Sequence, residues 1–298
     1  MNAMAPIGVV GAGLMGVGVA QCFAVAGHPV TVVEPSEEAR ATAPGRLADG
    51  LRMAALAGRG KARPAEVAAR VVWSGSLDDL RDAAFVVECA VEREPVKREI
   101  FRRLGEVCRP EAILTSCTSA VPISRLAAVT SLPHRVAGTH FMNPAPLKRA
   151  VEVIRARTTS ESALGRVLEL LESIGKSPVV VADAPGFVTN RVLMLTINEA
   201  AAVVQEGTAD PDVVDRIFRD CFGHPTGPLR TADLIGLDTV VDTLAVLHAH
   251  TGDARFRPCR LLAELVAEGR TGRKSSAGFH TYGGATRATG PKGSFRSR

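Results

Sequence analysis

A histidine and a glutamate, His140 and Glu152, interrupt two neighbouring apolar runs, G-T-H-F (138–141) and A-V-E-V-I (150–154). Charged groups are seldom buried unless a partner stabilises them. An imidazole, whose ordinary pKa is about 6.5, can accept a proton near neutral pH, and a carboxylate on its other nitrogen would fix the tautomer. The two residue types therefore suit a general base and the acid that orients it. Taken alone, however, a structural histidine–carboxylate pair is the favoured interpretation.

The segment G-A-G-L-M-G (11–16) could bind a phosphate group. It follows the apolar run I-G-V-V (7–10), which predicts a strand, and it opens an apolar run that predicts a helix. Glycines in this context allow a tight turn, close approach of a pyrophosphate and close packing of helix on strand. The N–H groups at the helix N-terminus favour negative charge. The residues expected to contact a dinucleotide here are Gly11, Gly13, Leu14, Met15 and Gly16.

Glu34 ends the next predicted strand, where its carboxylate would accept hydrogen bonds from the hydroxyls of an adenosine ribose. The segment E-P-S-E-E-A-R (34–40) carries three acids before its first base, which disfavours a ribose 2′-phosphate. The pattern therefore predicts NAD rather than NADP as the cofactor. A glycine turn followed by an ordinary surface glutamate is the less favoured alternative.

Short apolar runs alternate with helical patterns through the first half of the chain, which is typical of buried parallel strands in a doubly wound α/β sheet. The later pattern is helical. We therefore expect a sheet domain at residues 1–184 and an all-helical domain at 185–283, with the boundary near Pro185. The predicted strands are 7–10, 30–33, 71–73, 85–90, 112–116, 136–141 and 151–154.

Several motifs in order give the chain a specific resemblance to the 3-hydroxyacyl-CoA dehydrogenase family, which includes the 3-hydroxybutyryl-CoA dehydrogenases. The resemblance covers about residues 6–283. It implies a Rossmann-type NAD-binding domain, a helical substrate and dimerisation domain, a homodimer, and oxidation of (3S)-3-hydroxyacyl thioesters in fatty acid metabolism. The matching segments include G-A-G-L-M-G (11–16), V-E-C-A-V-E-R-E-P-V-K (87–97), T-S-C-T-S (115–119), G-T-H-F-M-N-P-A-P (138–146), V-E-V-I (151–154) and P-G-F-V-T-N-R (185–191).

The resemblance also implies roles for individual residues. The family's catalytic base falls on His140 and the acid that orients it on Glu152, which reverses the structural interpretation given above. Ser119 and Asn190 match the hydroxyl and amide near the reacting oxygen. The positions that match the family's other cofactor contacts are Glu92, Lys97, Asn143 and Lys274. For Lys97 and Lys274, ordinary surface charge remains an alternative.

Some departures from the family pattern bear on the substrate. Cys117 stands where the family usually has asparagine, and cysteine lacks the donors and acceptor of an amide. The polar residue and lysine that grip the coenzyme A nucleotide align with Gly50 and Ala57. An acyl carrier protein presents the same phosphopantetheine arm without the adenine nucleotide. The alternative substrate is therefore a carrier-bound acyl group, such as the glyceryl group that related enzymes oxidise towards hydroxymalonyl or methoxymalonyl extender units.

Composition and charge exclude several classes. The chain has 298 residues and a net charge of +5, and four basic residues with no acid follow Gly283. We read residues 284–298 as a basic flexible tail rather than a nucleic-acid-binding face. The six cysteines are dispersed without a C-x-x-C motif, so we expect no metal site, no disulfide framework and a cytoplasmic location. No apolar run approaches the ~20 residues of a membrane span, and no signal peptide is recognised.

Two other functional classes fit parts of the pattern. Ser119, His140 and Glu152 could form a hydrolytic triad, but the chain lacks the G-x-S-x-G motif of a nucleophile elbow. A non-catalytic NAD-binding structural or sensor protein would keep the dinucleotide fingerprint alone. The match at all four catalytic positions disfavours this second class.

Overall fold

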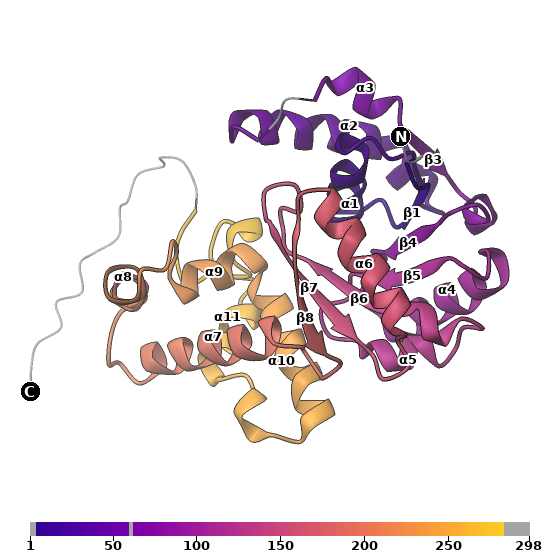
Figure 1. Ribbon diagram of the computed structural model, residues 1–298. Coiled ribbons are helices and arrows are strands. Elements are labelled where there is room, and N and C mark those ends of the chain that lie inside the picture. The colour runs from indigo at the N-terminus through magenta and orange to yellow at the C-terminus, as the bar shows by residue number, and fades with distance from the viewer. Residues whose placement is uncertain (1–3, 60–61, 283–298) are drawn as a thin grey trace, which may run out of the picture. The chain divides into compact units, whose positions relative to one another are not determined.

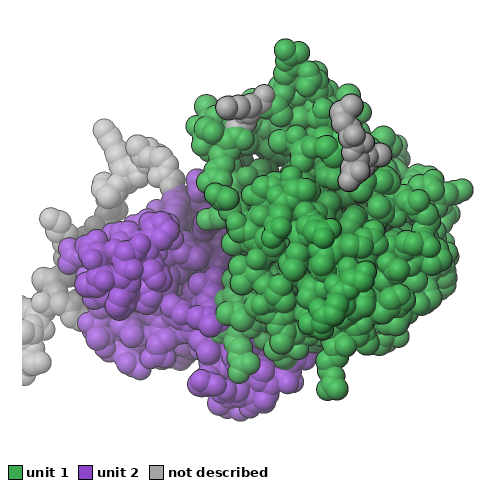
Figure 2. Space-filling model, in the orientation of Figure 1, with its two compact units in different colours: residues 1–191 green, residues 192–298 purple. Residues whose placement is uncertain are grey.

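The computed structural model describes residues 4–59 and 62–282, in two compact units that divide between Arg191 and Val192 (Figure 1, Figure 2). The predicted basic tail at 284–298 lies outside the described residues. Among the helices that are described, none is long and apolar enough to cross a membrane.

Unit 1, residues 1–191, is built on one mixed sheet with the strand order β3-β2-β1-β4-β5-β6-β7-β8. The order reverses between β1 and β4, and loops beside such a reversal form the crevice in which open α/β sheets bind ligands. The strands are β1 (Ile7–Val10), β2 (Val30–Val33), β3 (Val71–Ser74), β4 (Phe85–Glu88), β5 (Ile113–Ser116), β6 (Val136–Phe141), β7 (Ala150–Arg155) and β8 (Ser177–Ala182).

One strand departs from the parallel arrangement expected from the sequence. β7 pairs antiparallel with β6, whereas the other neighbouring strands pair parallel. Only residues 142–149 connect these two strands. A parallel crossover needs a dozen or more residues. A connection this short therefore makes the second strand antiparallel to the first. The reversal places His140 directly opposite Glu152.

Apolar cores lie on both faces of the sheet. The helices of this unit are α1 (Leu14–Val25), α2 (Glu37–Leu56), α3 (Pro64–Ala68), α4 (Glu94–Val107), α5 (Ile123–Ala127) and α6 (Glu161–Ser173), with 3₁₀ turns η1 (Leu77–Leu80) and η2 (Pro133–Arg135). One core contains Val9, Phe23 and Val87 and is covered by α1, α2 and α6, and the other contains Phe101 of α4 and Leu126 of α5.

The described part of unit 2, residues 192–282, is helical and has a core of its own that includes Ile197, Leu229, Leu244 and Phe256. The predicted doubly wound sheet followed by a helical part is thus confirmed (Figure 1). The helices are α7 (Thr189–Gln205), which begins in unit 1, α8 (Pro211–Phe222), α9 (Pro228–Ile235), α10 (Leu237–Thr251) and α11 (Arg260–Ala267), with 3₁₀ turns η3 (Ala254–Phe256) and η4 (Arg273–Ser275).

Candidate active site

The glycine loop joins β1 to α1, and its packing explains where glycine is required. Gly11 has a φ of +101°, and a side chain at Gly16 would collide with the Gly11 carbonyl oxygen at 1.9 Å. By contrast, nothing lies within 4 Å of a Cβ placed on Gly13. The loop is therefore closely packed at Gly11 and Gly16 and open at Gly13. The free N–H groups of α1, which begins with Leu14 and continues with Met15, lie beside this opening.

Glu34 follows β2 at the same edge of the sheet. Its Oε2 accepts a hydrogen bond from the Ala12 N–H at 3.0 Å, and its Oε1 accepts one from the Ser36 N–H at 3.1 Å. The carboxylate therefore sits directly on the glycine loop. A cavity of about 560 Å³ opens here, and Gly13, Glu34 and Cys89 are among its lining residues. Its position at the reversal in strand order suits a dinucleotide.

His140 and Glu152 form a buried pair across β6 and β7, and each is 6% exposed. His140 Nδ1 lies 3.1 Å from Glu152 Oε2. The other oxygen, Oε1, accepts hydrogen bonds from the N–H groups of Val188 at 2.8 Å and Thr189 at 3.1 Å, where α7 begins. Burial raises the pKa of the Glu152 carboxyl, but these hydrogen bonds outweigh burial, so its pKa is lowered overall. A carboxylate only accepts, so Nδ1 carries the proton and Nε2 is left as an acceptor.

Ser119 and Asn190 complete this cluster, and all four side chains belong to unit 1. Ser119 follows β5, and its Oγ lies 3.2 Å from His140 Nε2, the ring nitrogen that faces away from Glu152. Asn190 Nδ2 donates to the Ser119 carbonyl oxygen at 2.7 Å. The structure therefore brings together the four residues that sequence analysis placed around the reacting oxygen.

Glu92 and Lys97 lie in a charged network beneath Ser119. Lys97 is 1% exposed, which excludes the surface-charge alternative, and its Nζ donates to Glu88 Oε1 at 2.8 Å. Lys97 also pairs with Glu92 at 3.2 Å. Glu92 Oε1 in turn accepts from the N–H groups of Ser119 at 2.9 Å and Ala120 at 3.0 Å. Burial raises the pKa of Glu92, but Lys97 and the hydrogen bonds from the Thr118 hydroxyl and the Ser119 N–H lower it overall.

Comparison with known proteins identifies relatives of this chain. The family model for the NAD binding domain of 3-hydroxyacyl-CoA dehydrogenase matches residues 6–184, and the model for its C-terminal domain matches 186–282. The chain is 44% identical over 277 residues to a probable 3-hydroxybutyryl-CoA dehydrogenase of Bacillus subtilis, covering 92% of this chain and 96% of the relative. It is 42% identical over 275 residues to a probable 3-hydroxybutyryl-CoA dehydrogenase of Deinococcus radiodurans, covering 92% and 99%.

The crystal structure of FadB2 from M. tuberculosis matches with a TM-score of 0.91 and 38% identity, over 95% of this chain and all of that one. The chain belongs to the 3-hydroxyacyl-CoA dehydrogenase family. The predicted family is therefore confirmed, as are an NAD-dependent oxidoreductase and NAD as its cofactor.

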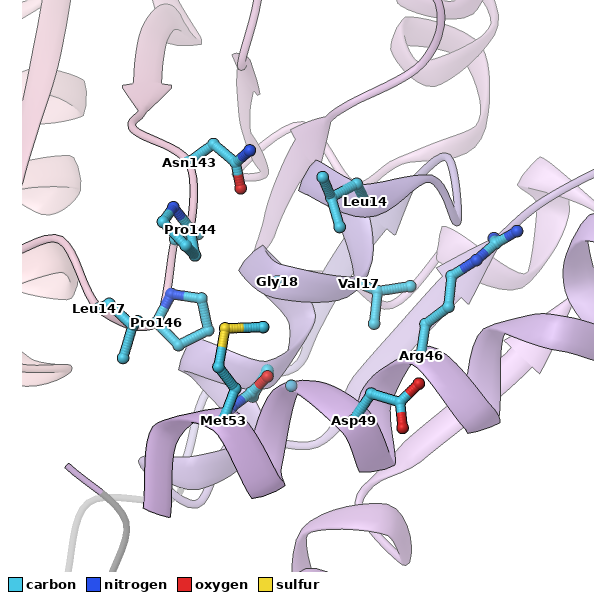
Figure 3. A pocket seen from close by; sticks show the side chains of 13 residues that line it. Leu14, Val17, Gly18, Arg46, Asp49, Met53, Asn143, Pro144, Pro146 and Leu147 are labelled. Carbon is cyan, nitrogen blue, oxygen red and sulfur yellow. The ribbon is translucent and has the colours of Figure 1, made fainter. Parts of the chain in front are cut away.

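Two further predicted contacts of this dehydrogenase are not members of the four-residue cluster. Asn143 follows β6 and, with Leu14, lines a second cavity of about 160 Å³ (Figure 3). Asn143 and Leu14 lie at one end of that view, and Asp49 and Met53 of α2 at the other. Lys274 belongs to unit 2, where it forms an ion pair with Asp238. Its predicted cofactor contact stays a prediction.

Sequence analysis missed Glu88, the buried partner of Lys97. Glu88 is fully buried at the end of β4, and its Oε2 also accepts from Ser116 Oγ at 2.6 Å. An acid that ends the apolar run F-V-V-E was a usable signal, because a carboxylate at such a position needs a cation or several donors. In this dehydrogenase Glu88 has both a cation and several hydrogen-bond donors. Its contacts stabilise the ends of β4 and β5 and the loops that follow them.

Proposed function

We propose that the protein oxidises (3S)-3-hydroxyacyl-CoA, with 3-hydroxybutyryl-CoA as the first substrate to test, and that His140 is the general base. The observation that carries this proposal is the chain of contacts from Glu152 through His140 to Ser119. The names of the relatives, probable 3-hydroxybutyryl-CoA dehydrogenases, support the choice of substrate.

In this mechanism the 3-hydroxyl group of the substrate binds beside Ser119 Oγ and gives its proton to His140 Nε2. NAD, which the glycine loop and Glu34 would hold, would supply the acceptor for the hydride that leaves C3. Glu152 keeps the proton of the imidazole on Nδ1, so that Nε2 is free to accept, and it stabilises the imidazolium that forms. Asn190 acts through the Ser119 backbone, because its amide donates to that carbonyl oxygen. We assign it a positioning role.

The test is NADH formation from (S)-3-hydroxybutyryl-CoA, followed by absorbance, with the (R) enantiomer and NADP as matched controls. We expect turnover with the (S) thioester and NAD, and little with either control. Absence of NADH formation from every 3-hydroxyacyl thioester tried, with NAD bound, would contradict the proposal.

A carrier-protein thioester is a second candidate substrate, and Gly50 is the observation that favours it. A Cβ at Gly50 would lie 2.3 Å from Gln21 Oε1, and Gln21 is itself only 2% exposed. A polar side chain at this position, which would grip the nucleotide of coenzyme A, would therefore displace Gln21. Gly50 and Met53 line the cavity of Figure 3, whose surface is more apolar than polar although Arg46 and Asp49 also line it. A pantetheine arm without a nucleotide needs no polar group here.

The two candidates are distinguished by measuring turnover by mass spectrometry. The same 3-hydroxybutyryl and glyceryl groups are supplied as thioesters of coenzyme A and of an acyl carrier protein. Ala57 is exposed after the end of α2, so Ala57→Lys should restore a cation and lower the KM for the coenzyme A ester alone. Ala55→Lys, also exposed, is the control. Equal or better turnover of the coenzyme A ester by the unmodified enzyme would reject the carrier protein.

A homodimer and a cytoplasmic location complete the proposal. Val192 on α7 and Phe222 on α8 are 59% and 63% exposed, although such side chains are usually buried. We propose that a second copy covers these helices. Light scattering of the purified protein would give the mass, and Val192→Asp should shift it towards the monomer. A monomeric unmodified enzyme at assay concentration would reject the dimer.

A further inference from the structure

Two half-buried thiols lie side by side at the edge of the dinucleotide cavity. Cys89 directly follows β4 and Cys117 directly follows β5, and these strands pair parallel with Glu88 opposite Ser116. The Cys117 N–H donates to the Glu88 carbonyl oxygen at 2.7 Å, so the pairing continues as far as the cysteines. Both side chains pack against the same apolar core, which places them on one face of the sheet.

The spacing of neighbouring strands permits a bond between these sulfur atoms. Strands in a sheet are about 4.8 Å apart, and disulfides form when the Cα atoms are about 4.4–6.8 Å apart. The ladder also stops here, because the Ala90 N–H donates to Glu88 Oε1 at 2.6 Å and the Thr118 N–H to Ser116 Oγ at 3.2 Å. Since both following amides bond to side chains, the backbone beyond each cysteine is not fixed by strand pairing.

The two thiols differ in acidity in the way that an attacking and a resolving thiol would. The hydrogen bond from Cys89 lowers the pKa of Cys117 against the effect of burial, with a smaller contribution from His140. The same hydrogen bond, together with burial, raises the pKa of Cys89. Cys117 is therefore the thiol that ionises first, and thiolates are the species that peroxides oxidise.

We propose that Cys89 and Cys117 are a redox modification site, whose reversible disulfide closes the dinucleotide site to NAD. Hydrogen peroxide is the oxidant. The Cys117 thiolate attacks one peroxide oxygen, giving a sulfenic acid and hydroxide, which takes up a proton to leave as water. The Cys89 sulfur then attacks the Cys117 sulfur, the S–O bond breaks, and the second oxygen leaves as water with the Cys89 proton. Two thiols are oxidised and one peroxide is reduced to two waters.

The position of the pair explains how the disulfide would act on the enzyme. Cys89 lines the dinucleotide cavity, and its carbonyl oxygen would lie 2.8 Å from a Cβ on Gly11. Any movement of Cys89 towards Cys117 therefore disturbs the glycine loop. On the other side, Cys117 is two residues from Ser119. Because a displacement of about 1 Å can cost ~10²-fold in rate, we expect oxidised enzyme to lose both NAD affinity and turnover.

The test oxidises the full-length enzyme with a small excess of hydrogen peroxide and reads the product by mass. We expect a loss of two hydrogen atoms from the intact protein and, after digestion without reduction, a cross-linked pair of peptides that carry Cys89 and Cys117. NADH-forming activity should fall about 10-fold or more and return with dithiothreitol. Saturating NAD, added before the peroxide, should slow the cross-link.

Variants separate this pair from the other thiols. Cys89→Ser and Cys117→Ser should each prevent the cross-link. Compared with its own activity before oxidation, neither variant should show the inactivation that dithiothreitol reverses. Cys221→Ser, which alters an exposed thiol on α8, should behave like the unmodified enzyme. Absence of a Cys89–Cys117 cross-link, or an equal reversible loss in Cys117→Ser, would overturn the proposal. The mass readout does not depend on which thioester is oxidised.

Discussion

Glu152 lies directly opposite His140 across the antiparallel β6–β7 pair, with its Oε2 3.1 Å from the imidazole Nδ1. Residues that face each other in such a pair have Cβ atoms only about 5 Å apart on the same face of the sheet. The contact therefore follows from strand register, and the side chains need no further loop to bring them together. Each of the following expectations depends on this pair or on the network that supports Ser119.

Replacing His140 by glutamine removes the proposed proton acceptor. We expect turnover to fall by about 10²–10⁴-fold, the usual contribution of acid–base catalysis, while the Kd for NAD changes little. Steady-state kinetics and calorimetric NAD titration measure the two effects. His134→Gln, at an exposed histidine of the same unit, is the control. Turnover near that of the unmodified enzyme would remove His140 from the mechanism.

Replacing Glu152 by glutamine leaves one acceptor oxygen where the carboxylate has two. Either the imidazole Nδ1 or the N–H groups of Val188 and Thr189 must lose their partner. We expect turnover to fall by about 10²–10⁴-fold, because the imidazole is no longer held in one tautomer. Glu161→Gln, at an exposed position on α6, should have no such effect. Equal losses in both variants would argue against a positioning role for Glu152.

The lowered pKa of Glu152 also predicts a pH dependence of stability. Its carboxyl has a lower pKa in the folded protein than the ordinary value of about 4.3, so it adds stability above that value. The contribution is lost as the pH falls through the folded pKa. The difference in unfolding free energy between the unmodified enzyme and Glu152→Gln should therefore shrink below about pH 4. Urea unfolding across that range measures it, and a constant difference would contradict the expectation.

Glu92 holds the loop that carries Ser119, and its replacement by glutamine should loosen that loop. The amide oxygen cannot replace the charge that pairs with Lys97 while accepting from Ser119 and Ala120. We expect kcat to fall about 10–10²-fold, since small displacements of a substrate-binding group are costly. Glu94→Gln, which removes an ion pair with Arg125, is the matched control. An unchanged kcat in Glu92→Gln would show that Ser119 is positioned by other contacts.

Replacing Lys97 by methionine should destabilise the protein strongly. It leaves the Glu88 carboxylate, which is fully buried, without its cation, and breaking such a pair costs about 3–5 kcal/mol. The double variant that also carries Glu88→Leu should lose less unfolding free energy than the single variant, because no unpaired charge remains at position 88. Urea unfolding of both variants, with Lys148→Met as an exposed control, tests this. A single variant as stable as the control would contradict it.

Most of the sheet could be predicted from the sequence, because strand length and apolar character are local properties. The runs at 7–10, 30–33 and 136–141 match β1, β2 and β6. The predicted parallel direction of β7 was wrong. Apolar character does not indicate the direction of a strand, whereas the short connection at 142–149 does. β8 was not predicted as a strand although it contains the apolar run V-V-V-A, and its side chains are largely exposed in the structure.

Long-range pairing accounts for what sequence analysis could not supply. Cys89 and Cys117 are far apart along the chain, and only the β4–β5 register makes them neighbours. Glu88 and Lys97 are only nine residues apart, but one ends β4 and the other lies on α4, so the acid and the base meet only once these two elements are in place. By contrast, the candidate catalytic residues were found because the family motifs that contain them are contiguous segments.

The hairpin formed by β6 and β7 has a consequence for how this acid–base pair is built and maintained. Both members lie within residues 136–155, so their separation is set by local chain pairing and not by the assembly of distant segments. Contacts of short sequence separation also need little loop closure and can form early. Substitutions in the remaining strands can therefore reshape the substrate pocket without changing the spacing between imidazole and carboxylate. This modularity makes the segment a suitable unit to transplant when the specificity of such enzymes is redesigned.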